Sequence, residues 1–269
     1  MKLNETEKRN PRSMNFDKMS TREMIELMND ENRRSVEAVE RALDSVEKAV
    51  DAIAEAFGRG NSLIYIGAGT SGRLGIQDAA ECGPTFGVPE GTVKAIIAGG
   101  RERVFTPAEN AEDVEENGRA DILKECRPGD VVVGISAAGG ARYVVGALNA
   151  AKKNGCFTVA LTNNTGTAIE KEADVAIVCE TGPEVITGST RLKAGNSQKF
   201  VLNMLTTCAM AKTGKVCENL MINLKPSNDK LRARVIRITS DLLGITQEEA
   251  EEKLKKHSFS IRETVDAEK

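Results

Sequence analysis

The fold of this chain is decided by the stretch Ser62-Leu63-Ile64-Tyr65-Ile66-Gly67-Ala68-Gly69-Thr70-Ser71-Gly72-Arg73, an apolar run that ends in a loop of small and hydroxylic residues. A short, continuous apolar run is typical of a buried parallel strand. The residues that follow it, 73–81, are typical of a helix. Backbone N–H groups at the start of a helix are unpaired and partly positive, so this loop predicts a phosphate-binding site.

The spacing Gly67-x-Gly69-x-x-Gly72 also fits a dinucleotide-binding fingerprint. That fingerprint requires an acidic residue at the end of the next strand, where it binds the ribose hydroxyls. The next predicted strand, residues 92–98, runs into Gly99-Gly100 and ends without a carboxylate. We therefore interpret Thr70 and Ser71 as hydroxyl donors to a phosphate of the ligand, and a dinucleotide is the weaker alternative.

Composition excludes several classes of partner. The 269 residues carry a formal net charge of −3, with acids and bases interspersed, so nothing predicts nucleic-acid binding. No apolar stretch has membrane-spanning length, and residues 1–7 lack the apolar core of a signal peptide, so we expect a cytoplasmic protein. The six cysteines form no C-x-x-C pair, and His257 is the only histidine. We therefore expect no metal site and no His-based triad.

Residues 1–58 are predicted to be an N-terminal addition of an arm and helices. The polar segment 1–20, which contains Asn10-Pro11, predicts an extended arm rather than a packed element. Ser20-Thr21-Arg22-Glu23 forms a capping box and predicts a helix start. A second segment, from Val36 to Ile53, has apolar residues three and four apart and leaves one apolar stripe to bury.

Residues 59–212 alternate between strand and helix patterns, which predicts an α/β core. Five strands with crossovers between them favour an open, doubly wound, five-stranded parallel sheet. The predicted strands are 63–67, 93–98, 131–136, 158–162 and 175–179, and the predicted helices are 74–82, 111–125, 143–154 and 168–172, with a long helix ending near Lys212. Residues 213–269 predict a C-terminal helical addition, with a capping box at Thr246-Gln247-Glu248-Glu249.

Ligands of such sheets bind outside the carboxyl ends of the strands, so the loops after the strands hold the candidate site. These loops are rich in hydroxyl groups, which suits a polyhydroxylated, phosphorylated ligand, although each is also an ordinary turn or helix cap. The predicted ligand-binding residues are Gly69, Thr70, Ser71, Ser136, Arg142, Ser189, Thr190 and Lys193.

With one histidine in the chain, acid–base chemistry would fall to other side chains. Glu81 is the first candidate, because Gly83-Pro84 is expected to end its helix and to leave the carboxylate partly buried near the negative end. Glu112 belongs to a second acidic run. The alternative for both is a solvated glutamate on a helix surface.

Several motifs together resemble the N-acetylmuramic acid 6-phosphate etherase family, whose members have a sugar-isomerase (SIS) fold. The resemblance runs from the N-terminal arm to about Lys230. A related branch of this family, the glucokinase regulatory protein, shares the sugar-phosphate fold without the catalysis. The motifs are Thr6-Glu7-x-Arg9-Asn10, Gly67–Gly75, Ala80-Glu81-Cys82-x-Pro84-Thr85-Phe86-Gly87, Ile97-Ala98-Gly99-Gly100, Ala111-Glu112-Asp113 and Thr187-Gly188-Ser189-Thr190-Arg191-Leu192-Lys193-Ala194-Gly195.

The resemblance implies a lyase that converts N-acetylmuramic acid 6-phosphate to N-acetylglucosamine 6-phosphate and D-lactate by elimination and hydration. It implies Glu81 and Glu112 as the acid–base pair, without assigning the two roles, and neither a redox cofactor nor a metal. It also implies a homodimer whose sites are completed by the neighbouring subunit. The alternative function is a non-catalytic sugar-phosphate-binding regulatory protein.

One loop departs from the family pattern. Where the family has a Ser-x-Ser-Gly-Arg-Thr-Pro-like sequence, this chain has Ser136-Ala137-Ala138-Gly139-Gly140-Ala141-Arg142, so two hydroxyl groups are missing. Either Arg142 replaces them as a bidentate phosphate ligand, or it points to solvent.

Overall fold

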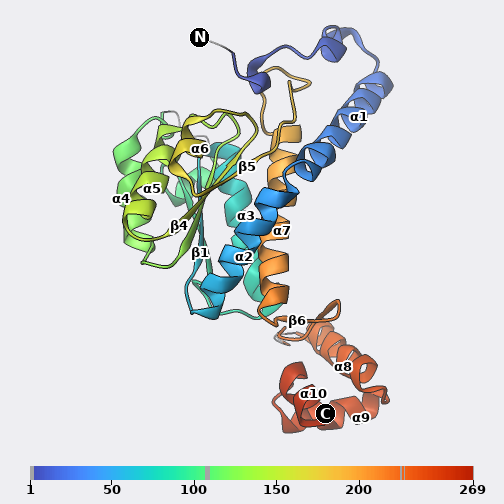
Figure 1. Ribbon diagram of the computed structural model, residues 1–269. Coiled ribbons are helices and arrows are strands. Elements are labelled where there is room, and N and C mark those ends of the chain that lie inside the picture. Colours follow the sequence, from blue (N-terminus) through green and yellow to red (C-terminus); the bar gives the residue numbers. More distant parts are fainter. Residues whose placement is uncertain (1–2, 107–109, 225, 227, 269) are drawn as a thin grey trace.

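The structure, a computed structural model, describes residues 3–106, 110–224, 226 and 228–268. Five parallel strands form one sheet in the order β2-β1-β3-β4-β5 (Figure 1). They are β1 (Leu63–Gly67), β2 (Val93–Ile97), β3 (Val131–Ile135), β4 (Phe157–Thr162) and β5 (Val175–Val178). Each strand lies within one residue of its predicted bounds, and the predicted α/β sheet is confirmed.

Helices cover both faces of the sheet. One face carries α2 (Leu43–Gly58), α3 (Gly69–Phe86) and α7 (Lys193–Lys212), and the other carries α4 (Glu115–Glu125), α5 (Arg142–Lys153) and α6 (Ala168–Glu172). Along β1, Leu63 and Tyr65 pack into the first core, whereas Ile64 and Ile66 pack into the second. Because both faces are covered, β1 is apolar throughout rather than alternating.

The strand order reverses between β1 and β3. The chain passes from β1 to β2 on one side and then returns to build β3, β4 and β5 on the other side. Gly67 at the end of β1 is paired with Ile135 at the end of β3, so the loops after these strands start at the same level. In an open α/β sheet such a reversal leaves a crevice between two diverging loops, and ligands bind there.

The loop after β1 is held by close backbone contact between Gly67 and Gly72. A Cβ atom on Gly67 would lie 2.9 Å from Gly72 N, and one on Gly72 would lie 2.8 Å from Gly67 O. Both distances are shorter than real Cβ contacts, so these two positions require glycine. The contact brings the first turn of α3 directly onto the end of β1.

The helix α3 is longer at both ends than predicted. It begins at Gly69, and the predicted stop at Gly83-Pro84 is wrong, because the helix continues to Phe86 and ends at Gly87 with φ of 65°. The side chain of Phe86 is buried beside Met210, and this packing stabilises the last turn although Pro84 contributes no N–H group.

The N-terminal arm is packed, contrary to the prediction. It forms three short 3-10 turns, Glu5–Glu7, Pro11–Ser13 and Phe16–Lys18. Thr6 is buried, its N–H donates to Asn164 Oδ1 at 3.2 Å, and Asn164 Nδ2 donates to Thr6 Oγ1 at 3.0 Å. These partners are 158 residues apart, so no local sequence pattern could predict the contact.

The arm leads into α1 (Thr21–Glu40), whose predicted capping box at Ser20 and Glu23 is confirmed. Figure 1 shows the first half of α1 extending away from the sheet. Ile25 and Val36 on this helix are exposed, at 59% and 58%. The helix thus leaves apolar side chains uncovered.

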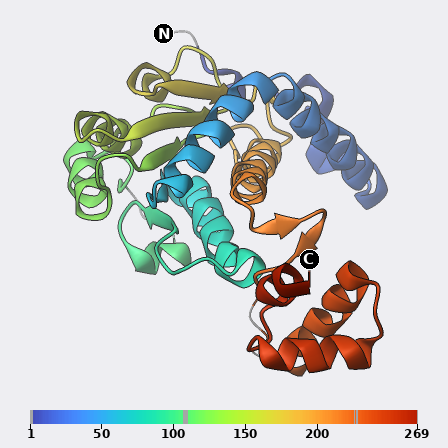
Figure 2. The same cartoon turned by 60° about the horizontal axis from the view of Figure 1, so that its bottom comes forward.

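The C-terminal region forms a hydrophobic core of its own. It contains the hairpin β6 (Val216–Cys217) and β7 (Leu220–Met221), and helices α8 (Asp229–Leu243), α9 (Gln247–Lys256) and α10 (Ile261–Glu268). Figure 2 shows these three helices grouped beyond the end of α7. The capping box at Thr246 is confirmed. The division of the chain at residues 58 and 212 stays a prediction.

Across the residues that the structure describes, no helix combines the length and the apolar character that a membrane span needs.

We predict that Gly72→Ala lowers the free energy of unfolding by about 1–3 kcal/mol, the usual effect of an overpacked site. The new methyl group would lie 2.7 Å from Ile97 Cγ1 as well as against Gly67 O. The matched control is Gly83→Ala in the same helix, where the methyl group meets nothing within 4 Å. Urea denaturation followed by circular dichroism tests both variants, and equal stabilities would contradict the prediction.

Candidate functional site

The crevice between β1 and β3 is lined on one side by the first turn of α3. The first N–H group of this turn with an acceptor is that of Gly72, which donates to Ala68 O at 3.2 Å. The N–H groups of Gly69, Thr70 and Ser71 precede it, and such groups at a helix start are available to a ligand. The helix dipole adds partial positive charge at this position.

The other side of the crevice is the loop Ser136–Arg142 and the first turn of α5. Gly139 N donates to Ser136 O at 3.0 Å and to Ser136 Oγ at 3.1 Å, so the Ser136 hydroxyl helps to shape the turn. The Arg142 side chain is 65% exposed, with its NH2 atom 3.8 Å from Glu115 Oε2. Of the two alternatives for Arg142, this exposure agrees with a side chain in solvent.

A cavity of about 230 Å³ opens beside the first turn of α3. Gly69, Thr70 and Glu112 line it together with Arg73 and Arg103. The backbone of Glu112 is fixed to the other side of the crevice, because Tyr143 N at the start of α5 donates to Glu112 O at 2.9 Å. The structure therefore brings Glu112 to both loops of the crevice.

Glu81 lies outside the cavity that Glu112 lines. It is exposed on α3, twelve residues after Gly69. At a rise of 1.5 Å per residue, the two positions are about 18 Å apart along the helix axis. The expected partial burial of Glu81 is wrong, because α3 does not end beside it. Within one chain, Glu81 therefore lies away from the cavity that Glu112 lines.

Ser71 is turned toward the protein interior. Its Oγ donates to Gln198 Oε1 at 2.9 Å, and Gln198 Nε2 donates to Asn163 Oδ1 at 3.1 Å. Asn163 Nδ2 in turn donates to Ser197 Oγ at 2.8 Å. The chain of buried bonds joins the starts of α3 and α7 to the loop after β4. Thr70, not Ser71, is the hydroxyl residue that lines the cavity.

Lys193 is also buried. Its Nζ pairs with Glu31 Oε2 on α1, and both side chains are 1% exposed. Asn10 Nδ2 donates to the same carboxylate at 2.8 Å, and Arg12 NH1 donates to Glu31 Oε1 at 2.9 Å. Burial alone would raise the pKa of Glu31, but its bond to Lys193 and the nearby cations hold that pKa below the ordinary value. Lys193 was predicted to contact the ligand directly. In the structure it instead joins α7 to α1 and the arm.

A second buried carboxylate, Glu184, caps α7. It accepts hydrogen bonds from Lys193 N at 3.3 Å and Ala194 N at 2.9 Å. Burial raises the pKa of Glu184 above its ordinary value, and these backbone bonds oppose the rise. Ser189 and Thr190 lie half-buried in the turn before α7, which these bonds hold in place.

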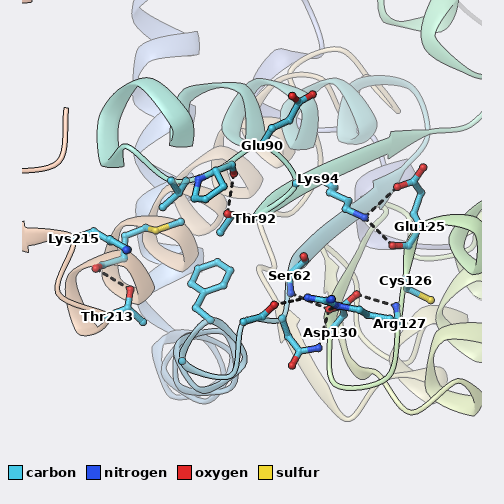
Figure 3. A pocket seen from close by; sticks show the side chains of 18 of the residues that line it. Ser62, Glu90, Thr92, Lys94, Glu125, Cys126, Arg127, Asp130, Thr213 and Lys215 are labelled. Atoms are coloured by element: carbon cyan, nitrogen blue, oxygen red, sulfur yellow. Dashed lines mark hydrogen bonds and ion pairs between the residues drawn. The ribbon is translucent and has the colours of Figure 1, made fainter. Parts of the chain in front are cut away.

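A larger cavity, of about 860 Å³, lies at the opposite edge of the sheet. Figure 3 shows its polar residues bonded to one another: Lys94 Nζ to Glu125, and Asp130 to the backbone N–H groups of Ser62 and Arg127. These residues adjoin the amino ends of the strands. Since ligands of open α/β sheets bind at the carboxyl ends, the smaller cavity is the candidate site.

Sequence reasoning missed the two arginines of the cavity. Arg73 donates to three carbonyl oxygens of the segment that follows β2: Val104 O at 2.7 Å, Arg103 O at 3.0 Å and Thr106 O at 3.3 Å. Arg73 belongs to the glycine-rich segment after β1, but its position in the sequence gives no information about where its guanidinium group points. Arg103 lies in a short 3-10 turn, Arg101–Val104, in one of the loops expected to hold the ligand, but nothing in the sequence distinguishes it from Arg101.

The parallel sheet and the crevice at its strand ends are those of an open α/β fold, and the comparisons with known proteins identify it as a SIS fold. The sequence model of the SIS domain matches residues 103–208, and that of the glucokinase regulatory protein N-terminal SIS domain matches residues 29–152. Among solved structures, phosphoheptose isomerase of Neisseria gonorrhoeae is similar with a TM-score of 0.55, at 20% identity over 71% of this chain and 100% of that chain. Phosphoheptose isomerase of Francisella tularensis has a TM-score of 0.54, at 14% identity over 71% of this chain and 98% of that chain.

Curated relatives define the family more narrowly. The N-acetylmuramic acid 6-phosphate etherase of Symbiobacterium thermophilum is 48% identical over 98% of this chain and 89% of its own length. That of Clostridium beijerinckii is 48% identical over 96% of this chain and 85% of its own length. The chain belongs to the N-acetylmuramic acid 6-phosphate etherase family, as the sequence motifs predicted.

We predict that Lys193→Met lowers the free energy of unfolding by about 3 kcal/mol, because it leaves the Glu31 carboxylate buried without its ammonium partner. The control is Lys212→Met in the same helix, which removes an exposed pair with Asp51 and should cost less than about 1 kcal/mol. Adding Glu31→Gln to Lys193→Met should recover part of the loss. Thermal unfolding measures all three effects, and equal losses for Lys193 and Lys212 would contradict the assignment.

Proposed function

We propose that this protein is a carbon–oxygen lyase that cleaves the D-lactyl ether of N-acetylmuramic acid 6-phosphate. The products are N-acetylglucosamine 6-phosphate and D-lactate. Two observations support the proposal: family membership over nearly the whole chain, and a carboxylate, Glu112, in the crevice cavity beside an anion-binding helix start. The cytoplasm stays the predicted location.

The chemistry suits carboxylates. In the ring-opened sugar, the C2 proton is acidic because it lies next to the aldehyde, so a carboxylate can remove it. The C3–O bond then breaks, and the departing lactate oxygen takes a proton from an acid. Water adds to the double bond, with its hydroxyl group on C3 and its proton on C2. The overall reaction consumes one water and changes no oxidation state, so it requires no redox cofactor.

Glu81 and Glu112 are the proposed acid–base pair, with the order of their roles left to experiment. The phosphate is proposed to bind the N–H groups at the starts of α3 and α5, with Gly69, Thr70, Ser71 and Ser136 around them. The ligand-binding residues proposed from the sequence also include Ser189, Thr190, Lys193 and Arg142. For Lys193 we propose an indirect role: its bond to Glu31 holds the Ser189–Thr190 turn in position.

A homodimer is proposed to complete the site. The separation of about 18 Å between Gly69 and Glu81 along α3 is too long for both carboxylates of one chain to reach the same C2–C3 bond. A neighbouring copy that presents its own Glu81 to the cavity would solve this problem. The exposed Ile25 and Val36 on α1 offer an apolar surface for such a contact.

The regulatory-protein alternative has weaker support. The glucokinase regulatory protein match covers residues 29–152, whereas the etherase relatives match 96–98% of the chain. A binding protein would also have less use for an acid–base pair. Retention of Glu81 and Glu112 therefore favours the enzyme.

We predict that Glu112→Gln and Glu81→Gln each lower D-lactate release by about 10²–10⁴-fold, the usual effect of losing a general acid or base. Glu116→Gln, at an exposed position on α4, is the control and should keep wild-type activity. Exchange of the C2 proton in D₂O assigns the roles, because the variant that still exchanges retains the base. A fully active variant would remove that residue from the mechanism.

We predict that refolding an equal mixture of the two inactive variants restores about a quarter of wild-type activity. Half of randomly assembled dimers would pair unlike chains, and each would carry one intact site of two. Light scattering on the same samples measures the oligomeric state. A mixture that stays inactive although mixed dimers form would contradict a site shared between copies.

A further inference from the structure

The substrate of the proposed reaction carries two anionic groups, and the sugar product keeps only one. The phosphate ester on C6 is common to both, whereas the carboxylate belongs to the lactyl group that leaves from C3. A cation near C3 would therefore distinguish the ether from its product. The following inference rests on the proposed function and concerns that cation.

The two helix starts of the crevice offer backbone N–H groups, and these suit the phosphate. The cavity beside α3 differs, because it adds two guanidinium groups, Arg73 and Arg103, next to Glu112. Both arginines are half-buried. In the described residues, none of the ion pairs within 4.0 Å joins Arg73 to a carboxylate, and Arg73 donates to three carbonyl oxygens. The cavity thus brings two guanidinium groups together with a proposed catalytic carboxylate.

Arg73 fixes the position of the segment that carries Arg103. Its three bonds to Val104 O, Arg103 O and Thr106 O join α3 to the segment that carries Arg103. The Arg103 side chain contacts the Thr106 hydroxyl at 3.4 Å and lines the cavity. The backbone that presents Arg103 is therefore fixed to the same helix whose first turn borders the cavity.

The volume of the cavity and the distances between groups in the substrate favour the lactyl group as the part that the cavity binds. At about 230 Å³ the cavity is smaller than the roughly 300–1,000 Å³ of sites that hold a whole ligand, so it takes part of the substrate. The carboxylate is separated from C2 by three atoms: C3, the ether oxygen and one carbon. The phosphate is separated from C2 by five atoms. A carboxylate bound beside Glu112 thus lies close to the proton that must be removed.

We propose that Arg103 binds the lactyl carboxylate of the substrate and so selects the ether over the product sugar. A guanidinium presents a planar fork of donors that matches the two oxygens of a carboxylate. Arg103 is then a specificity-determining residue rather than part of the acid–base pair.

The test compares Arg103→Gln with Arg101→Gln, an exposed arginine in the same turn that does not line this cavity. In Arg103→Gln, KM for the ether should rise about 10- to 100-fold, as expected for a lost charge-assisted bond, while kcat changes less. Competitive inhibition by D-lactate should weaken by a similar factor. Inhibition by N-acetylglucosamine 6-phosphate, which has no carboxylate, should stay unchanged. Arg101→Gln should behave like the wild type.

Each other outcome is decisive. If inhibition by N-acetylglucosamine 6-phosphate weakens in parallel, Arg103 binds the phosphate, and the inference is wrong. If KM for the ether and inhibition by D-lactate both stay at wild-type values, Arg103 binds neither anion. Arg103→Lys keeps the charge without the planar fork and should give intermediate values, which guards against a folding defect in the glutamine variant.

Failure of the proposed function can be recognised separately. Titration of D-lactate into the wild-type protein and into Arg103→Gln, followed by calorimetry, needs no turnover. If the wild-type protein releases no D-lactate from the ether but binds D-lactate through Arg103, the lyase proposal fails and the carboxylate site stands. If the protein is an active lyase and D-lactate binds both proteins equally, the carboxylate site fails alone.

Discussion

The close contact between Gly67 and Gly72 is the constraint on which the site depends. Since neither position tolerates a Cβ atom, the first turn of α3 sits directly against the end of β1. The pairing of Gly67 with Ile135 sets the second loop at the same level. Two helix starts therefore face one crevice at the point where the strand order reverses, and their N–H groups and dipoles make it suited to anions. The backbone geometry thus suits the crevice to an anionic ligand before any side chain is considered.

Buried charge holds the remaining parts to this core. Glu31, Lys193 and Glu184 lie out of solvent and join α1, α7 and the loop before α7, while Asn10 and Arg12 bring in the N-terminal arm. Replacing one member of such a network costs more than an exposed pair would, because it leaves a charge in a place that water does not reach. The turn with Ser189 and Thr190 is thus positioned by interactions with distant parts of the chain.

The two proposed catalytic carboxylates differ in how the fold places them. Glu112 is tied by its backbone to α5 and lines the cavity with the first turn of α3, whereas Glu81 lies three turns farther along the same helix. A helix is a rigid spacer, so this distance cannot be closed by side-chain motion. This distance is the reason for proposing a homodimer, and the exposed apolar residues of α1 offer a surface for the contact between copies.

The sequence by itself determined the five strands, their parallel α/β arrangement, the capping boxes at Ser20 and Thr246, and the family. These features are local or periodic: a buried strand is apolar throughout, a cap needs a hydroxyl and an acid three residues later, and motifs are read in order. Only the tertiary structure decided that the arm is packed, that α3 continues past Pro84, that Lys193 faces Glu31, and that Arg73 and Arg103 border the cavity. The reason is physical: Lys193 and Glu31 are 162 residues apart, and the direction of a long side chain depends on neighbours that folding alone brings together. Residue type and spacing carry no record of those neighbours.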